Sequence, residues 1–330
     1  MERFALAAAV VLGFALTAAL CSLFVPLRRV LERREQQQPV QPEPPRPAPL
    51  RAPLWGGLCA AAGTVAAVGV GWLAVCVGQP ELLGSEGRLM TRLLTALAGS
   101  LAFGAVGLAE DLARMRSPAA LGLRRDVRLL LEALAAAFVL LLLRAAGCLP
   151  RGLGVPGAGY VLLGSAVPFL WAVLMVALAE CARIAERDEG AVCGAAFVAM
   201  LALMMVEAGL GVSGLAVLPG ALAGALVALG LWAFPPARLG VGCCGSLLAA
   251  GAIGCIPLSL DMTSLTVPLA LPFWAAGGLL AAQLLCAKRT GKPLRCWVKK
   301  HKMSPETVFL CSFALSAVGY VLALALLRWC

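Results

Sequence analysis

Two short acidic segments stand out in a chain that holds only 17 acidic residues. Glu110-Asp111 follows one apolar stretch, and residues 180–189 follow another. Carboxylates at a membrane edge can bind Mg²⁺, a hard cation that takes oxygen ligands and keeps water positions for substrate phosphates. The alternative is that these residues are solvated helix-end charges paired with nearby arginines. Spacing alone favours this second interpretation.

Two further loops have residue types that suit phosphate groups. Residues 235–246 read PPARLGVGCCGS, and glycine-rich turns let backbone N–H groups approach phosphate oxygens; the alternative is a plain turn between helices. Residues 288–306 hold seven Lys and Arg residues and the only histidine, His301. This loop could bind substrate phosphates or the anionic leaflet, at about 1 kcal/mol per cation. His301 alone could act as an acid or a base.

Composition shows which elements must position these segments. Of the 330 residues, 61% are hydrophobic and 13% charged, whereas a soluble domain is about 45–50% apolar and about 25% charged. The apolar residues form stretches of the length that crosses about 30 Å of hydrocarbon. Such segments must be helices or closed barrels, and their lack of period-two alternation excludes a barrel. The sequence therefore predicts an all-α, multi-pass membrane bundle.

The hydropathy pattern predicts ten membrane spans, which place both termini on one side. Five loops then face the other side and hold 21 of the 27 Lys and Arg residues. This asymmetry places the five loops in the cytoplasm and the termini outside. It also assigns the net charge of +10 to the membrane surface rather than to nucleic-acid binding. The predicted spans are 4–26, 54–77, 93–109, 129–147, 157–179, 191–211, 213–234, 244–260, 265–287 and 307–328.

We expect one integral membrane domain over residues 1–330. Within it, residues 27–53 are rich in Pro and Gln and predict a flexible cytoplasmic loop. The 13 cysteines show no spacing typical of a disulfide framework. Glu132 and Glu207 lie within or near apolar segments; we expect Glu132 to reach the cytoplasmic face and Glu207 to approach water at the other end.

In order along residues 49–328, five segments resemble the polyprenyl-phosphate N-acetylhexosamine-1-phosphate transferase superfamily (glycosyltransferase family 4), and within it the phospho-N-acetylmuramoyl-pentapeptide transferases. Residues 52–57 (APLWGG) are similar to the family's TPTMGG, and 107–114 (GLAEDLAR) to its G-x-x-DD-x-x-K. Residues 122–136 resemble its GLS-x-x-x-K-LL-x-Q segment, 234–246 its FPPAK…MGDTGS segment, and 288–305 its His-rich loop.

The resemblance implies a reaction. The phosphate of a polyprenyl phosphate would attack the β-phosphorus of a UDP-amino sugar, here muramoyl-pentapeptide, and release UMP for peptidoglycan synthesis. Mg²⁺ would neutralise the diphosphate. The implied setting is a bacterial cytoplasmic membrane, and the resemblance leaves a homodimer open.

The same motifs imply site residues. Three carboxylates would handle the metal or the acceptor phosphate: Asp111, Glu110 and Asp188, with Asp111 and Asp188 as metal ligands. Three guanidiniums would hold phosphates: Arg114, Arg128 and Arg238. The nucleotide-side turn and the basic loop would add Gly242, Gly245, Ser246 and His301.

The chain also departs from the family pattern at its polar positions. Ala179, Ala182 and Ala185 replace two asparagines and an aspartate, Cys243 replaces the aspartate of MGD, and Glu186 lies one residue out of register. Exchanging a hard ligand for a soft one suits Mg²⁺ poorly. A second hypothesis is therefore a catalytically impaired paralogue that binds a lipid phosphate or a partner protein. A third, a transporter, lacks visible internal repeats.

Overall fold

The computed structural model describes most of the chain and is almost entirely helical. It covers residues 2–36, 55–78, 87–116, 122–150, 152–155, 159–162, 164, 166–186, 190–212, 214–234, 238–290 and 305–329. The helices are α1 (Glu2–Gln36), α2 (Gly56–Gly78), α4 (Gly87–Arg116), α5 (Arg125–Ala145), α6 (Ala166–Ala185), α7 (Ala191–Gly209), α8 (Val217–Ala233), α9 (Gly242–Ser259), α10 (Thr266–Leu269), α11 (Leu271–Thr290) and α13 (Pro305–Trp329). A 3-10 turn, η1 (Thr263–Leu265), precedes α10.

This arrangement confirms the all-α membrane bundle, while the count of ten spans is not confirmed. Among the described residues, seven helices are long and apolar enough to cross a membrane, or eight if the bent segment 263–282 counts as one. α8 is apolar but has only 17 residues. α5 carries Arg128, Glu132 and Arg144 among its leucines. The protein is nevertheless multi-pass.

Three predicted boundaries differ from the structure. The span expected at 157–179 begins only at Ala166, because β1 (Gly152–Val155) and β2 (Gly159–Leu162) pair as antiparallel strands before it. The span expected at 265–287 bends by 64° between α10 and α11, since Pro272 has no N–H to continue the helix. α1 runs to Gln36, so residues 27–36 of the expected loop are helical, and 37–53 lie outside the described residues.

α9 lies at the centre of the bundle and packs against α2, α4, α6 and α7. All 18 residues of α9 are buried. In the apolar stretches of α1 and α13, only 22% and 17% of the residues are buried. Small residues allow this, because α9 reads GCCGSLLAAGAIGCIPLS. A methyl group added at Gly107 of α4 would overlap the carbonyl of Cys243. The α4 and α9 backbones therefore meet closely where Glu110 and Asp111 stand.

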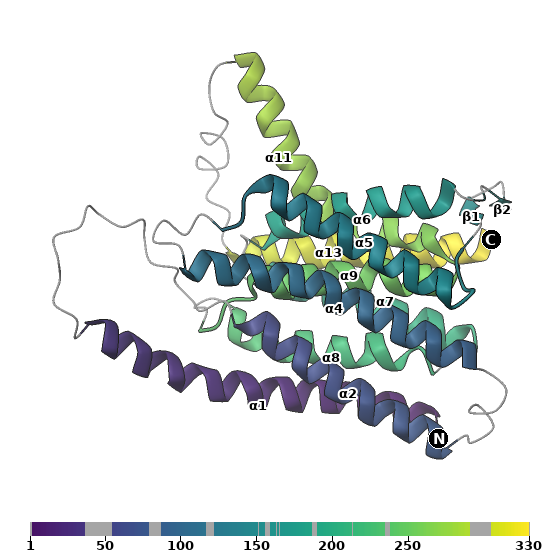
Figure 1. Cartoon of the computed structure of the whole chain (residues 1–330), viewed down its shortest axis with the longest axis horizontal. Coiled ribbons are helices and arrows are strands. Elements are labelled where there is room, and N and C mark those ends of the chain that lie inside the picture. The colour runs from purple at the N-terminus through teal and green to yellow at the C-terminus, as the bar shows by residue number, and fades with distance from the viewer. Residues whose placement is uncertain are drawn as a thin grey trace.

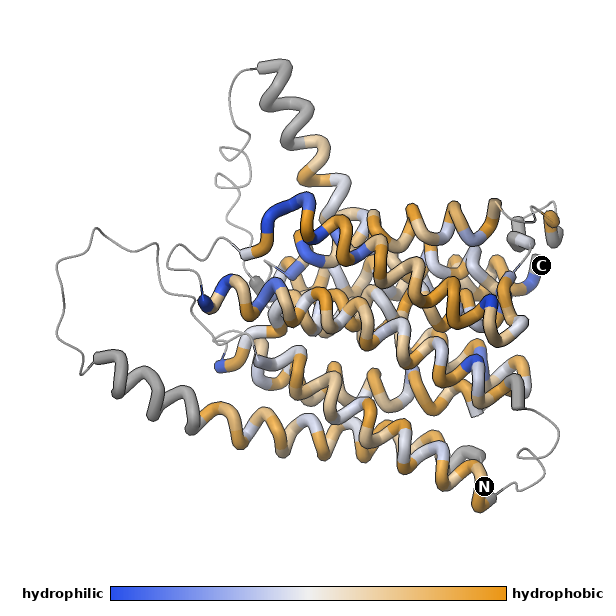
Figure 2. Tube along the Cα trace, viewed as in Figure 1, coloured by the Kyte–Doolittle hydropathy of each residue, from blue (hydrophilic) through white to orange (hydrophobic). Residues whose placement is uncertain are grey.

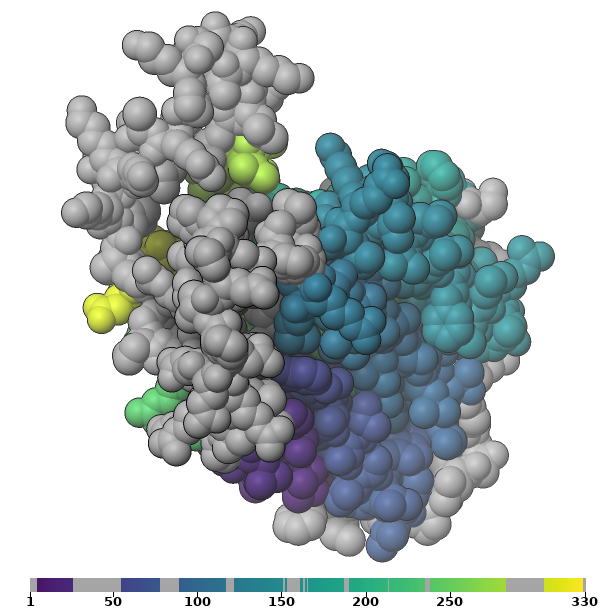
Figure 3. Space-filling view, turned by 60° about the vertical axis from the view of Figure 1, so that its left-hand side comes forward, coloured from purple at the N-terminus to yellow at the C-terminus, as the bar shows by residue number. Residues whose placement is uncertain are grey.

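The two ends of the bundle differ in polarity. The first residues of α1 and the last of α13 lie at one end (Figure 1). Hydrophilic segments gather at the opposite end, where α4 finishes and α5 starts (Figure 2). Seen towards this polar end, α4 and α5 lie above α1 and α2 (Figure 3). The polar end is where the described parts of the motif segments 52–57, 107–114, 122–136 and 234–246 meet.

Candidate active site

Segments that resemble family motifs converge at the polar end, although they are far apart in the sequence. The N–H of Gly56, at the start of α2, donates to the carbonyl of Gly240 at 3.2 Å. Gly57 lies so close to Gly245 that an added methyl group would overlap its backbone nitrogen. The start of α2 and the end of α4 thus both pack on the turn that opens α9.

Asp111 holds that turn in place. Its two carboxylate oxygens accept from the backbone N–H groups of Cys243, at 3.0 Å, and Cys244, at 2.9 Å. These are first-turn donors of α9, which have no partner within their own helix. Gly242, just before them, has a φ of 70°, a conformation that glycine adopts without strain. Because Asp111 is 0% exposed, it is not the solvated charge that spacing alone favoured.

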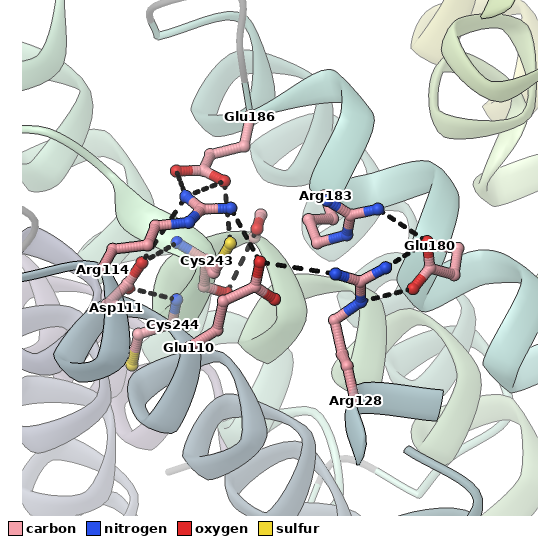
Figure 4. A network of polar contacts seen from close by, with 10 residues as sticks. Glu110, Asp111, Arg114, Arg128, Glu180, Arg183, Glu186, Cys243 and Cys244 are labelled. Carbon is pink, nitrogen blue, oxygen red and sulfur yellow. Dashed lines mark hydrogen bonds and ion pairs between the residues drawn. The ribbon is translucent and has the colours of Figure 1, made fainter. Parts of the chain in front are cut away.

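Arg114 lies between three carboxylates (Figure 4). Its Nη2 is 2.9 Å from Oε1 of Glu110, and its Nη1 is 3.4 Å from Oε2 of Glu186. The same Nη1 is 3.9 Å from Oδ1 of Asp111. The Cys243 thiol donates to Glu186 Oε2 at 2.9 Å. Glu186, one residue out of register in the sequence comparison, therefore does reach the site from the end of α6.

A second group of ion pairs joins α5 to α6. Arg128 forms a two-point contact with Glu180, with Nε 2.7 Å from Oε1 and Nη2 3.3 Å from Oε2. Arg183 binds the same carboxylate at 2.7 Å. Arg128 also reaches Glu110, with Nη1 3.7 Å from Oε1. This contact links both groups into one network, which contains the guanidiniums of Arg114, Arg128 and Arg183 (Figure 4).

Glu132 lies one helical turn after Arg128 and is fully buried. It is 0% exposed, and neither carboxylate oxygen has a hydrogen-bond partner in the described part of the structure. Glu207, on α7, is also buried. The expectation that these two residues reach water is therefore wrong, because neighbouring helices cover both side chains.

Three ligand atoms converge as a metal site would require. Oxygens of Asp111 and Glu186 and the sulfur of Cys243 lie within 4.8 Å of one another. Mg²⁺ requires octahedral oxygen ligands, whereas a thiol suits softer cations. Arg114 already contacts both carboxylates of this set. Among the described residues the donor set therefore does not fit Mg²⁺, and the magnesium ion stays a prediction from the sequence.

The other expected site residues are placed as follows. Ser246 is buried and donates to the carbonyl of Cys243 at 3.1 Å, so its hydroxyl serves α9 itself. Arg238 is exposed just before the α9 turn. Asp188 and His301 lie outside the described residues. The roles assigned to all of these residues stay predictions.

Glu180, Arg183, Glu186 and Cys243 are not among the site residues that the motifs imply, although the first three lie in the segment 180–189, yet all four lie in the network. A signal existed for the first two, because Glu180 and Arg183 stand three residues apart, a spacing that brings side chains together on a helix. No local signal indicates that the Cys243 thiol meets Glu186, since 57 residues separate them.

Comparison with known protein families identifies the family to which this chain belongs. The model of glycosyl transferase family 4 matches residues 93–261, which include the end of α4, the ion pairs and the α9 turn. The chain belongs to glycosyl transferase family 4. Proteins of this family are membrane-embedded transferases that move phosphosugars onto polyprenyl phosphates. No match to the chain is found among curated proteins.

Proposed function

We propose that this family 4 protein transfers an amino-sugar 1-phosphate from a UDP-sugar to a polyprenyl phosphate. An oxygen of the lipid phosphate attacks the β-phosphorus of the UDP-sugar, and the bond from that phosphorus to the bridging oxygen breaks. UMP leaves with the bridging oxygen, and a lipid-linked diphosphate sugar remains. We propose muramoyl-pentapeptide as the sugar and a bacterial cytoplasmic membrane as the setting, with the polar end facing the cytoplasm.

One observation carries the proposal. Asp111 bonds to two backbone N–H groups of the α9 turn, at 3.0 and 2.9 Å, and so joins the two motif segments that resemble the family most specifically. Arg114, Arg128 and Arg183 lie in the same network. Guanidiniums match phosphate oxygens two at a time, so such a cluster suits a site that handles two phosphate-bearing substrates.

In this proposal the protein acts by positioning and by charge stabilisation, which dominate phosphoryl transfer. Arg128 and Arg183 both bind Glu180, and either can exchange that carboxylate for a phosphate oxygen without losing its charge pairing. Asp111 keeps the α9 turn in place beside the reacting groups. The support for the sugar is the resemblance of residues 107–114 and 234–246 to the muramoyl-pentapeptide enzymes.

The test is UMP release by the purified full-length protein in lipid nanodiscs. UDP-MurNAc-pentapeptide and UDP-GlcNAc are each supplied with and without polyprenyl phosphate. We expect release that requires the lipid, is faster with the first sugar, and falls at least about a hundredfold in Arg128→Ala, about 2.7 kcal/mol of barrier. Met205→Ala, which lies at the far end of the bundle, is the matched control. Release without lipid, or from neither sugar, would exclude the proposal.

A second candidate is a protein that binds lipid phosphate without transfer. It is favoured by Cys243, which replaces a carboxylate of the family motif, and by Arg114, whose guanidinium is engaged by carboxylates. Equilibrium binding of radiolabelled polyprenyl phosphate separates the two candidates. Saturable binding, lost in Arg128→Ala and unaccompanied by UMP release, would support this second candidate.

A further inference from the structure

We infer that the guanidinium of Arg114 occupies the place of a divalent cation beside Asp111, Glu186 and Cys243, so that these three residues bind no Mg²⁺. The inference rests on the proposed function, because it states that a side chain of the protein supplies the positive charge of that same site. It starts from the disagreement between the donor set at Asp111, Glu186 and Cys243 and the ligands that Mg²⁺ prefers.

The position of Arg114 is the first argument. A cation bound by the trio would touch one carboxylate oxygen of Glu186 and one of Asp111. Nη1 of Arg114 already lies 3.4 Å from Oε2 of Glu186 and 3.9 Å from Oδ1 of Asp111. Its Nη2 is also fixed, at 2.9 Å from Glu110. A divalent ion in the same space would be repelled by this guanidinium.

The state of the ligand atoms is the second argument. Both oxygens of Asp111 accept from backbone N–H groups of the α9 turn. The Cys243 thiol keeps its proton and donates a hydrogen bond to Glu186 Oε2, so the sulfur offers neither the charge nor the hardness that Mg²⁺ needs. Each member of the trio thus has a partner within the protein.

Burial is the third argument. Asp111, Glu110 and Cys243 are all buried, and a buried carboxylate must be paired with a cation or be neutral. Arg114, 19% exposed at its side chain, supplies that pairing from one turn further along α4. The guanidinium is planar and always charged, so it can neutralise several carboxylates at once.

The experiment titrates the full-length protein in nanodiscs with Mn²⁺, an electron-spin-resonance probe that replaces Mg²⁺. We expect the wild-type protein and Asp111→Asn to bind the same amount of Mn²⁺, because none is bound at this trio. We also expect the same thermal unfolding midpoint in EDTA as in Mg²⁺. One Mn²⁺ per chain, displaced by Mg²⁺ and weakened by Asp111→Asn, would overturn the inference. So would a sulfur-to-metal absorption band with Cd²⁺ that disappears in Cys243→Ser, since a soft ion would then hold the place.

A double variant provides the converse test. Cys243→Asp with Arg114→Ala restores a third carboxylate and removes the competing guanidinium. Its affinity for Mn²⁺ should exceed that of Cys243→Asn with Arg114→Ala by at least about tenfold, or about 1.4 kcal/mol. Equal affinities in two folded variants would contradict the inference. If either variant does not fold, the wild-type titration still decides.

Failure of this inference and failure of the proposed function are distinguishable, because the titration contains no substrate. UMP release that requires a bound Mn²⁺ would remove the inference and keep the transferase. Absence of release from a protein that binds no Mn²⁺ would remove the transferase and keep the inference.

Discussion

The two ends of α9 are built in opposite ways. At its start, Cys243 and Cys244 enter a network of directed contacts between 2.7 and 3.9 Å. At its end, Leu260 and Asp261 border a cavity of about 630 Å³. Its other lining residues are mostly apolar and include Met205, Leu210, Met262, Leu265 and Leu327.

This difference predicts where the protein is sensitive to substitution and where it tolerates substitution. Each group in the network fixes the position of another, so removing one leaves a buried charge or donor without its partner. In the cavity wall, contacts are non-directional and space is available. When one side chain is shortened, its neighbours can therefore adjust at little cost. Substitutions should therefore have large effects at the start of α9 and small effects at its end.

The largest effect is expected from Arg128→Ala. It leaves Glu180 with only Arg183 and removes the link to Glu110. Glu180 is 24% exposed at its side chain and keeps Arg183, so the loss of the two charge-assisted bonds from Arg128 should cost about 1.5–3 kcal/mol. Equilibrium unfolding in mild detergent measures the loss, with Arg144→Ala, exposed at the far end of α5, as the control. Equal losses in the two variants would show that the network is not what stabilises this end.

Asp111→Asn should have the next largest effect. Asparagine can accept from only one of the two α9 donors and presents its own NH₂ group to the other, a loss of about 1–3 kcal/mol. UMP release should fall with it, because the α9 turn is no longer fixed. The comparison variant is Asp261→Asn at the other end of α9, where φ is 63°, a conformation that asparagine tolerates. If Asp261→Asn proves the more damaging, the contrast between the two ends fails.

The sequence predicted the helices better than their breaks. Hydropathy located the long apolar segments, but it contains no information about the angle between helix axes. It therefore could not show the 64° bend between α10 and α11. In the same way, the pattern identified the helices but not which is central. α9 and α13 are both apolar, and α9 is buried because its residues are small.

For the site, the motifs identified Glu110, Asp111, Arg114 and Arg128, and the structure brings all four together. The choice of partners could not be predicted. Which carboxylate each guanidinium meets depends on how α4, α5 and α6 pack, and not on spacing along one helix. Residues 179–186 lack the polar residues of the family motif at three positions, yet Glu180 and Glu186 supply carboxylates to the network.

Gly107→Ala disturbs the start of α9 without changing a charge. The added methyl group overlaps the carbonyl of Cys243, so α4 must move away from α9 and stretch the bonds from Asp111. Overpacking of this kind costs about 1–3 kcal/mol. The matched control is Gly278→Ala on α11, where an added methyl group meets no atom within 4 Å. That change should be neutral or slightly stabilising, because alanine favours helices. Similar losses in both variants would refute a close contact at Gly107.

The smallest effect is expected at the cavity, from Met205→Ala. Met205 lines it but is 57% exposed on the bundle surface, so its loss removes few protein contacts. We expect the free energy of unfolding to change by no more than about 0.5 kcal/mol and UMP release to keep its wild-type rate. A fall in UMP release with Met205→Ala would show that the two ends of α9 are coupled, and that the cavity belongs to the same functional unit as the charged network.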